Sequence, residues 1–140
     1  MSHLKYTTPA GFGQDTLKHY NYNQVVELPS SGKILRIAGQ GGQNYETGEF
    51  VSTDVTKQID QAFKNVQHIL TQAGGQGWQQ VFNVTSYHHS LDDNTQAAMV
   101  RNFAQWMPNH KACWTCVAIT ALGGGPNMQV EVVVEAHIPE

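Results

Sequence analysis

The sequence predicts an α+β fold in which one mixed sheet carries two helices on one of its faces. Two segments repeat apolar residues with helical spacing, and a strand-like segment separates them. Short segments rich in β-branched and aromatic residues flank this unit, in the order ββαβαββ, with an antiparallel hairpin expected at each end. The second face of such a sheet also needs cover, which self-association supplies.

Length and composition indicate a single small domain. The 140 residues suit one hydrophobic core, so we expect one domain over residues 1–140, with an extended lead-in over residues 1–19. Charged residues make up 14%, the net charge is −3, and the basic residues are scattered, which argues against nucleic-acid binding. Residues 1–13 have no apolar segment of the kind found in a secretory signal, and no apolar run approaches the roughly 20 residues that a membrane helix needs, so we expect neither feature. We therefore expect a cytoplasmic protein with free thiols.

The first half of the chain predicts a hairpin, a glycine-rich loop and a helix. Residues 20–28 alternate like a strand that ends at Pro29, and residues 34–38 form a second, apolar strand after a turn. The glycines of residues 39–44 exclude a helix and suit a loop whose backbone closely approaches another group. Residues 54–73 have one apolar face, with Asp54 or Thr53 as the cap and Gly74 as the stop.

The second half predicts a strand over residues 81–89, a helix over residues 95–107 and two final strands. These strands cover residues 112–122 and 128–138, around a glycine-rich turn. The last strand alternates strongly, which places Glu131 and Glu135 on the same face. Two interpretations of this face remain open: a row of solvent-facing side chains, or a carboxylate in a subunit cleft that moves protons or orients water.

Other motifs exclude several kinds of chemistry. Cys113 and Cys116 match CxxC, but residues i and i+3 of a strand point to opposite faces, so we expect neither a redox pair nor a zinc site. His88 and His89 are adjacent in a strand and cannot chelate one ion, so we expect no metal. The glycines after residue 38 lack the lysine of a phosphate-binding loop, and no nucleophile-elbow motif is present.

Several segments, in order over residues 20–138, resemble the Rid (YjgF-like) family. The helix QIDQAFKNVQHILTQAG over residues 58–74 is the most specific match to the family pattern. The other matches are NYNQ at residues 21–24, IAGQ at 37–40, NYETG at 44–48, the strand over residues 81–87, CWTCV at 113–117, and the terminal strand segment over residues 131–136.

The resemblance implies a chorismate-mutase-like fold and a homotrimer with a barrel core, three subunit clefts and no cofactor. It also implies hydrolysis of reactive enamines and imines to keto acids and ammonia. Carried over by position, Tyr22, Gly39 and Cys116 match the family's cleft tyrosine, loop glycine and cysteine. The acid on the last strand, which is thought to orient water, is Glu131 or Glu135.

One position departs from the family pattern. Trp114 stands where the family has an arginine that clamps the substrate carboxylate. An indole offers one N–H and an apolar face, whereas arginine offers a charged bidentate donor. We therefore expect an enzyme for an imine, enamine or related unstable carbonyl intermediate that is not a simple amino-acid derivative, with Trp114 as a binding wall. The alternatives are a non-catalytic ligand-binding or regulatory trimer and, against the acidic charge balance, an endoribonuclease.

Overall fold

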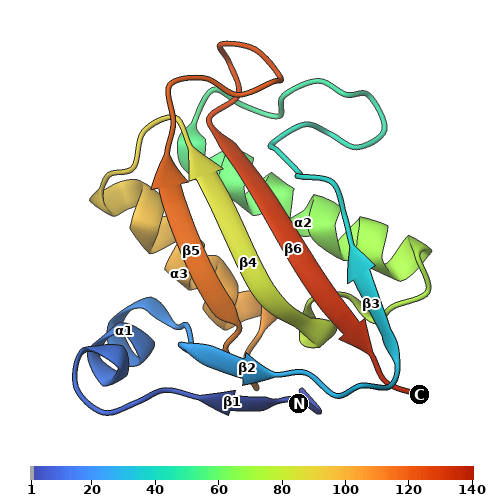
Figure 1. Cartoon of the computed structure of the whole chain (residues 1–140). Helices are drawn as coiled ribbons and strands as arrows, with labels where there is room; N and C mark the ends of the chain where they lie inside the picture. The colour runs from blue at the N-terminus through green and yellow to red at the C-terminus, as the bar shows by residue number, and fades with distance from the viewer. Residues whose placement is uncertain (1) are drawn as a thin grey trace.

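The computed structural model describes residues 2–140. A four-stranded mixed sheet is backed on one face by two long helices, and a small ribbon with a short helix lies across one end of the sheet (Figure 1). The elements are β1 (Lys5–Thr7), α1 (Phe12–Tyr20), β2 (Val25–Glu27), β3 (Lys33–Arg36), α2 (Val55–Gln72), the 3₁₀ helix η1 (Gly77–Gln80), β4 (Val81–His88), α3 (Asp93–Trp106), β5 (Cys113–Ala118) and β6 (Val130–Ile138). The α+β class, the mixed sheet and the ββαβαββ order from β2 onward are confirmed.

The two long helices begin and end for local reasons. Asp54 caps α2 by accepting a hydrogen bond from the backbone N–H of Thr56, and Asp92 caps α3 through Thr95. After α2 the chain passes through Gly74, whose φ of +91° suits a residue without a side chain. The apolar stripe predicted for residues 54–73 is buried from Ile59 to Val66 and at Leu70, so this helix covers the sheet as expected, whereas Ile69 is half-buried and Ala73 is exposed.

The predicted strand pairing is wrong at both ends of the chain. The sheet order is β3-β6-β4-β5, so β3 pairs with β6, and β2 pairs with β1 in a separate two-stranded ribbon. At the other end, β4 lies between β5 and β6 and pairs with β5 in parallel. The helical connection through α3 explains the parallel pairing of β4 with β5, because a crossover of this kind returns the chain to run in the same direction as before. The last strand then pairs on the other side of β4.

The extended lead-in predicted for residues 1–19 is also wrong. This segment contains β1 and α1. Helix α1 ends at Tyr20, which was the first residue of the strand predicted over residues 20–28. Few apolar residues mark α1, so the sequence of this segment shows no clear helical period. Asn21 ends it in the left-handed conformation, with φ of +58°.

The two faces of the sheet differ in their environment. Alternate residues of β6, from Val130 to Ala136, are at most 1% exposed and pack with the helices in the core. The opposite, open face carries half-buried residues, with Tyr87 opposite Glu131 and Thr85 opposite Val133. Glu131 and Glu135 therefore share the open face, as their spacing predicts. None of the helices formed within residues 2–140 combines the length and apolar character that crossing a bilayer requires.

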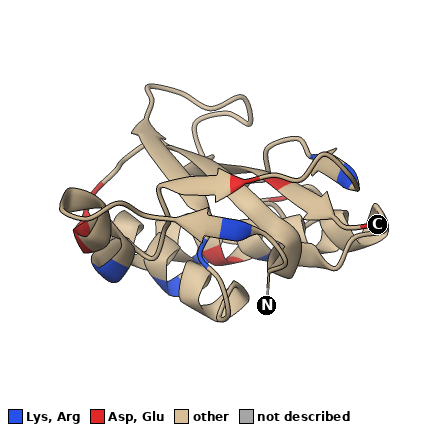
Figure 2. Cartoon of the chain, turned by 60° about the horizontal axis from the view of Figure 1, so that its bottom comes forward, with Lys and Arg blue, Asp and Glu red and all other residues tan. Residues whose placement is uncertain are grey.

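Charged side chains are sparse on this fold. The Lys and Arg positions, blue in Figure 2, are dispersed along the ribbon and do not gather on one element. The chain has eight Lys and Arg residues against eleven Asp and Glu residues. An extended phosphate-binding surface is therefore not supported by this charge distribution.

Candidate functional site

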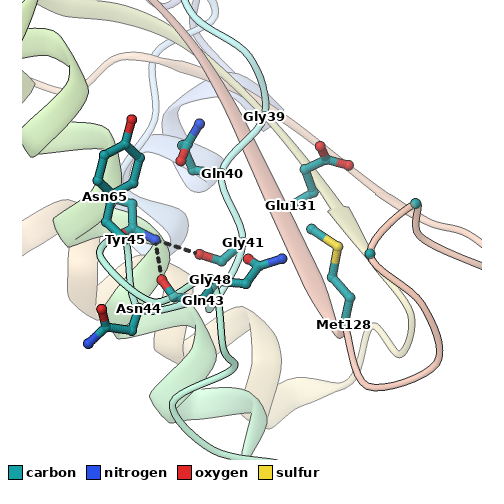
Figure 3. A pocket seen from close by; sticks show the side chains of 12 residues that line it. Gly39, Gln40, Gly41, Gln43, Asn44, Tyr45, Gly48, Asn65, Met128 and Glu131 are labelled. Atoms are coloured by element: carbon teal, nitrogen blue, oxygen red, sulfur yellow. Dashed lines mark hydrogen bonds between the residues drawn. The ribbon is translucent and has the colours of Figure 1, made fainter.

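A pocket of about 440 Å³ lies between β6 and the loop that follows β3 (Figure 3). We call it the glycine pocket because glycines supply much of its wall. Its lining residues are Gly39, Gln40, Gly41, Gln43, Asn44, Tyr45, Gly48, Asn65, Gly123, Gly124, Met128 and Glu131. Sheet alternation brings Glu131 to this pocket, and the loop after β3 and the turn before β6 supply the glycines.

Gly39 and Glu131 are in close contact across this pocket. A Cβ atom at position 39 would lie 2.3 Å from Oε1 of Glu131, so only glycine leaves room for the carboxylate there. Within residues 2–140, the Glu131 side chain has no hydrogen-bond or ion-pair partner. A half-buried carboxylate without such a partner is suited to accept a proton from water or from a ligand.

Two buried side-chain amides of α2 hold the loops that form the glycine pocket. Asn65 donates to the carbonyl oxygens of Gly41, at 3.0 Å, and Gln43, at 2.7 Å (Figure 3). Gln58 donates to the carbonyl oxygens of Ser52 and Asn127 and accepts from the backbone N–H of Gln129. The same helix thereby holds the loop after β3 and the turn before β6, which are the two walls of the pocket.

Glu135 is on the same face but in different surroundings. Its carboxylate lies 3.2 Å from Nε of Arg36 and accepts a hydrogen bond from Asn83 at 3.1 Å. The residue does not line the glycine pocket. The surroundings of the two acids therefore favour Glu131 for proton transfer and a structural role for Glu135.

A second pocket, of about 330 Å³, lies at the free edge of β5. We call it the aromatic pocket; it is lined by Tyr20, Tyr22, Gln96, Trp114, Thr115 and Cys116. The Tyr22 and Trp114 rings meet edge to face, with centroids 5.6 Å apart. Cys116 packs against the core and lines this pocket, and Cys113 is half-buried on the open face. Burial raises the pKa of both free thiols.

The indole of Trp114 is anchored in the core. Trp114 is 9% exposed and packs against Phe103 at a centroid distance of 5.0 Å. Its Nε1–H donates to Oγ of Ser86 at 2.9 Å, and Nε2 of His88 lies 2.8 Å from the same oxygen. Burial lowers the pKa of His88 to about 4, so this network is uncharged at neutral pH.

The residues predicted for the site are thus divided between two places. Gly39 and Glu131 meet in the glycine pocket, and Tyr22, Trp114 and Cys116 meet in the aromatic pocket. Trp114 shares the helix-facing side of the sheet with Val84 and Val134, whereas Glu131 is on the open face. One chain therefore does not bring Glu131 to Trp114.

Several residues that shape these pockets are not among the predicted site residues. Asn65 and Gln58 carry a signal that was available, because both are amides on the otherwise apolar face of an amphipathic helix. Ser86 and Gln96 carried none, because their roles depend on packing between β4, β5 and α3. No group of three or more His, Cys, Asp or Glu side chains suited to hold a metal ion occurs among residues 2–140.

Comparison with known proteins identifies relatives over most of the chain. Residues 14–138 match the family model described as Endoribonuclease L-PSP. A RutC family protein of Pyrococcus horikoshii is 29% identical over 112 residues, which cover 80% of this chain and 84% of that protein. A RutC family protein of Pyrococcus abyssi is 27% identical over the same shares of the two chains.

Solved structures share the fold. A Rid-family protein of unknown function from Yersinia pestis, YyfB, superimposes with a TM-score of 0.84 at 23% identity, and the match covers 96% of this chain and 98% of that chain. RidA from an Antarctic Psychrobacter superimposes with a TM-score of 0.67 at 26% identity, with 94% of each chain covered. The likeness to YyfB concerns the fold alone.

Proposed function

From the premise that this chain belongs to the Endoribonuclease L-PSP family, also called the YjgF or Rid family, we propose that it is a small-molecule enzyme. Its substrate is an imine, enamine or related unstable carbonyl intermediate of a specialised pathway, and it needs no cofactor. The observation that carries this proposal is the Glu131 carboxylate, which lies against Gly39 in a pocket of about 440 Å³ without a hydrogen-bond partner within residues 2–140. RidA among the structural relatives supports the choice of substrate class.

In the proposed reaction Glu131 moves a proton between water and the substrate. The carboxylate accepts a proton from water as the water oxygen bonds to the carbon of the protonated imine, which gives a neutral carbinolamine. The resulting carboxylic acid passes this proton to the nitrogen, the carbon–nitrogen bond breaks as the hydroxyl proton of the carbinolamine returns to the carboxylate, and ammonia and a carbonyl compound leave. Positioning and general acid–base catalysis of this kind account for a modest acceleration, on the order of 10²–10⁴-fold.

The proposal includes a homotrimer, because the two pockets do not meet within one chain. Glu131 is on the open face and Trp114 is on the helix-facing side at the β5 edge. A cleft between subunits would join the aromatic pocket of one chain to the glycine pocket of another. The open face, which none of the helices within residues 2–140 covers, supports such an arrangement (Figure 1).

A specific observation favours a second candidate function, a non-catalytic ligand-binding trimer. The Trp114 ring packs into the core and its N–H is engaged by Ser86, so it adds no donor beside the carboxylate. Ribonuclease activity, which the family description names, is disfavoured by the eight basic residues against eleven acidic ones.

The test compares two imines generated in situ. Threonine dehydratase supplies 2-iminobutanoate from threonine, and a flavin-dependent amine oxidase supplies phenylmethanimine, which has no carboxylate, from benzylamine. We expect the protein to accelerate release of benzaldehyde and not release of 2-oxobutanoate, because no arginine clamp is present at residue 114. Trp114→Arg should gain activity toward 2-iminobutanoate.

Two matched variants identify the catalytic acid. Glu131→Gln should lower the acceleration of benzaldehyde release by about 10²-fold, the scale of one lost general base. Glu135→Gln should change it less than about twofold, because that carboxylate is paired with an exposed arginine. Rapid release of 2-oxobutanoate by the wild type would show an ordinary imine deaminase. Acceleration of neither reaction would favour the non-catalytic trimer.

A further inference from the structure

The aromatic pocket has an unusual composition for a site in a small-molecule enzyme. Three aromatic side chains, two of them phenols, line it together with one amide, one aliphatic hydroxyl and one thiol, and the lining includes no Asp, Glu, Lys, Arg or His. Burial raises the pKa of the Cys116 thiol, which keeps it protonated. Planar walls of this kind favour flat ligands, because aromatic rings pack edge to face or in offset stacks.

The indole N–H of Trp114 already has a hydrogen-bond acceptor. The Trp114 N–H donates to Ser86 at 2.9 Å inside the core, and Ser86 is in turn paired with His88 at 2.8 Å. Both Ser86 and His88 are 0% exposed. Trp114, which is 9% exposed, therefore presents only a small part of its ring to the pocket, while its N–H is bonded inside the core and is unable to bind a carboxylate in the pocket.

Neighbouring cations do not complete a carboxylate site either. Arg101, on α3, forms an ion pair with Asp60 at 2.9 Å and is not among the residues that line the aromatic pocket. Lys111, just before β5, is also outside the lining. A carboxylate in this pocket would lose water without gaining a charged partner, which is costly.

Gln96 supplies the amide of the lining, which can orient a polar substituent. Within residues 2–140 its side-chain amide makes no hydrogen bond in the structure, although the residue is partly buried at the pocket. A primary amide can donate and accept at the same time. It therefore matches a ligand that carries a carbonyl, imine or amide group next to a ring.

We propose that the aromatic pocket binds an uncharged planar ring that carries a carbonyl, imine or amide group, with the ring against Tyr22 and Trp114 and the polar group on Gln96. This inference rests on the proposed function only in regarding the bound ring as the substrate. It names the substrate class as neutral aromatic imines and related carbonyl compounds.

The test uses benzamide and benzoate, which have the same shape and differ in charge. Binding to the full-length protein is followed by NMR, through the indole N–H signals and the backbone amides of residues 114–116. We expect benzamide to shift these signals and to bind at least about tenfold more tightly than benzoate, and Trp114→Arg to reverse the order. Equal binding of the two probes, or no binding of either at millimolar concentration, would overturn the inference.

A matched pair of variants on α3 tests whether benzamide binds in the aromatic pocket. Gln96→Leu should weaken benzamide binding about tenfold, because its hydrogen bonds are lost. Gln105→Leu, on the same helix but at a different pocket, should leave the affinity unchanged. Equal effects of the two variants would also overturn the inference. Benzamide binding without turnover of phenylmethanimine contradicts the proposed enzyme only, whereas turnover without preference for benzamide contradicts the specificity only.

Discussion

At the scale of single residues, two acids of one strand differ because of their neighbours. The two-residue period of β6 places Glu131 and Glu135 on the open face. Arg36 and Asn83 then engage Glu135, and Gly39 leaves space at Glu131. The distinction between a structural acid and a candidate proton carrier therefore depends on residues far away in the sequence.

A second residue-scale feature is the buried imidazole of His88. Its Nδ1 has no hydrogen-bond partner within residues 2–140, and burial lowers its pKa from 6.5 to about 4. Below pH 6.5 the unfolded chain binds a proton at His88 that the folded chain does not bind. The folded state therefore loses stability as the pH falls from about 6.5 to about 4.

We predict that His88 makes the free energy of unfolding decrease by about 3 kcal/mol over this pH range. The measurement is urea unfolding at several pH values for the wild type and His88→Gln, which has no titrating group at residue 88. The variant should be less stable at pH 7 and should show a shallower decrease toward pH 4. Parallel pH profiles for the two proteins would contradict the prediction.

At the scale of elements, α2 does more than cover the sheet. Its apolar stripe packs in the core, while Gln58 and Asn65 on the same buried side hold two loops that are distant in sequence. Buried amides with several hydrogen bonds define the position of a loop more narrowly than apolar contacts do. The glycine pocket thereby depends on a helix that contributes only Asn65 to its lining.

We predict that Asn65→Ala destabilises the protein by about 2 kcal/mol, because the carbonyl oxygens of Gly41 and Gln43 lose their donor. Hydrogen–deuterium exchange should increase over residues 39–44 more than in the sheet. Lys64→Ala, one residue earlier and exposed, is the control and should change the stability by less than about 0.5 kcal/mol. Uniform exchange over the whole chain in Asn65→Ala would contradict a specific role in the loop.

At the scale of the whole molecule, the sheet is covered on one face only. The helices α2 and α3 lie behind it, and the face toward the viewer in Figure 1 has no helix. At the centre of this open face, Val133 is paired with Thr85, and both are half-buried in the single chain. An antiparallel sheet can leave one face in water, so the open face is compatible with the proposed trimer without requiring it.

We predict that the wild type is a trimer in analytical ultracentrifugation and that Val133→Lys shifts it to the monomer. The substitution would bury an unpaired ammonium group in the interface, which is strongly unfavourable. Gln72→Lys, at the exposed end of α2, adds the same charge elsewhere and should remain a trimer. A monomeric wild type, or a trimeric Val133→Lys protein, would contradict the proposed use of this face.

The local sequence pattern determined much of the secondary structure of this protein and which faces of its elements are buried. The periodicity of residues 54–73 and the alternation of residues 130–136 predicted the long helix, its buried stripe and the shared face of the two acids, because these properties depend only on neighbours within a few residues. The family resemblance predicted the fold class, and the comparison over residues 14–138 confirmed the family.

Only the tertiary structure decided how the strands pair and which predicted site residues meet. Strand order depends on the crossover through α3, whose direction no local pattern shows. The Trp114 indole could have faced a cleft as a donor, and its contact with Ser86 on the neighbouring strand turned its N–H into the core instead. Hydrogen bonds and packing between segments distant in sequence determine these features. Each such contact depends on the three-dimensional positions of both partners, which a local sequence pattern does not contain.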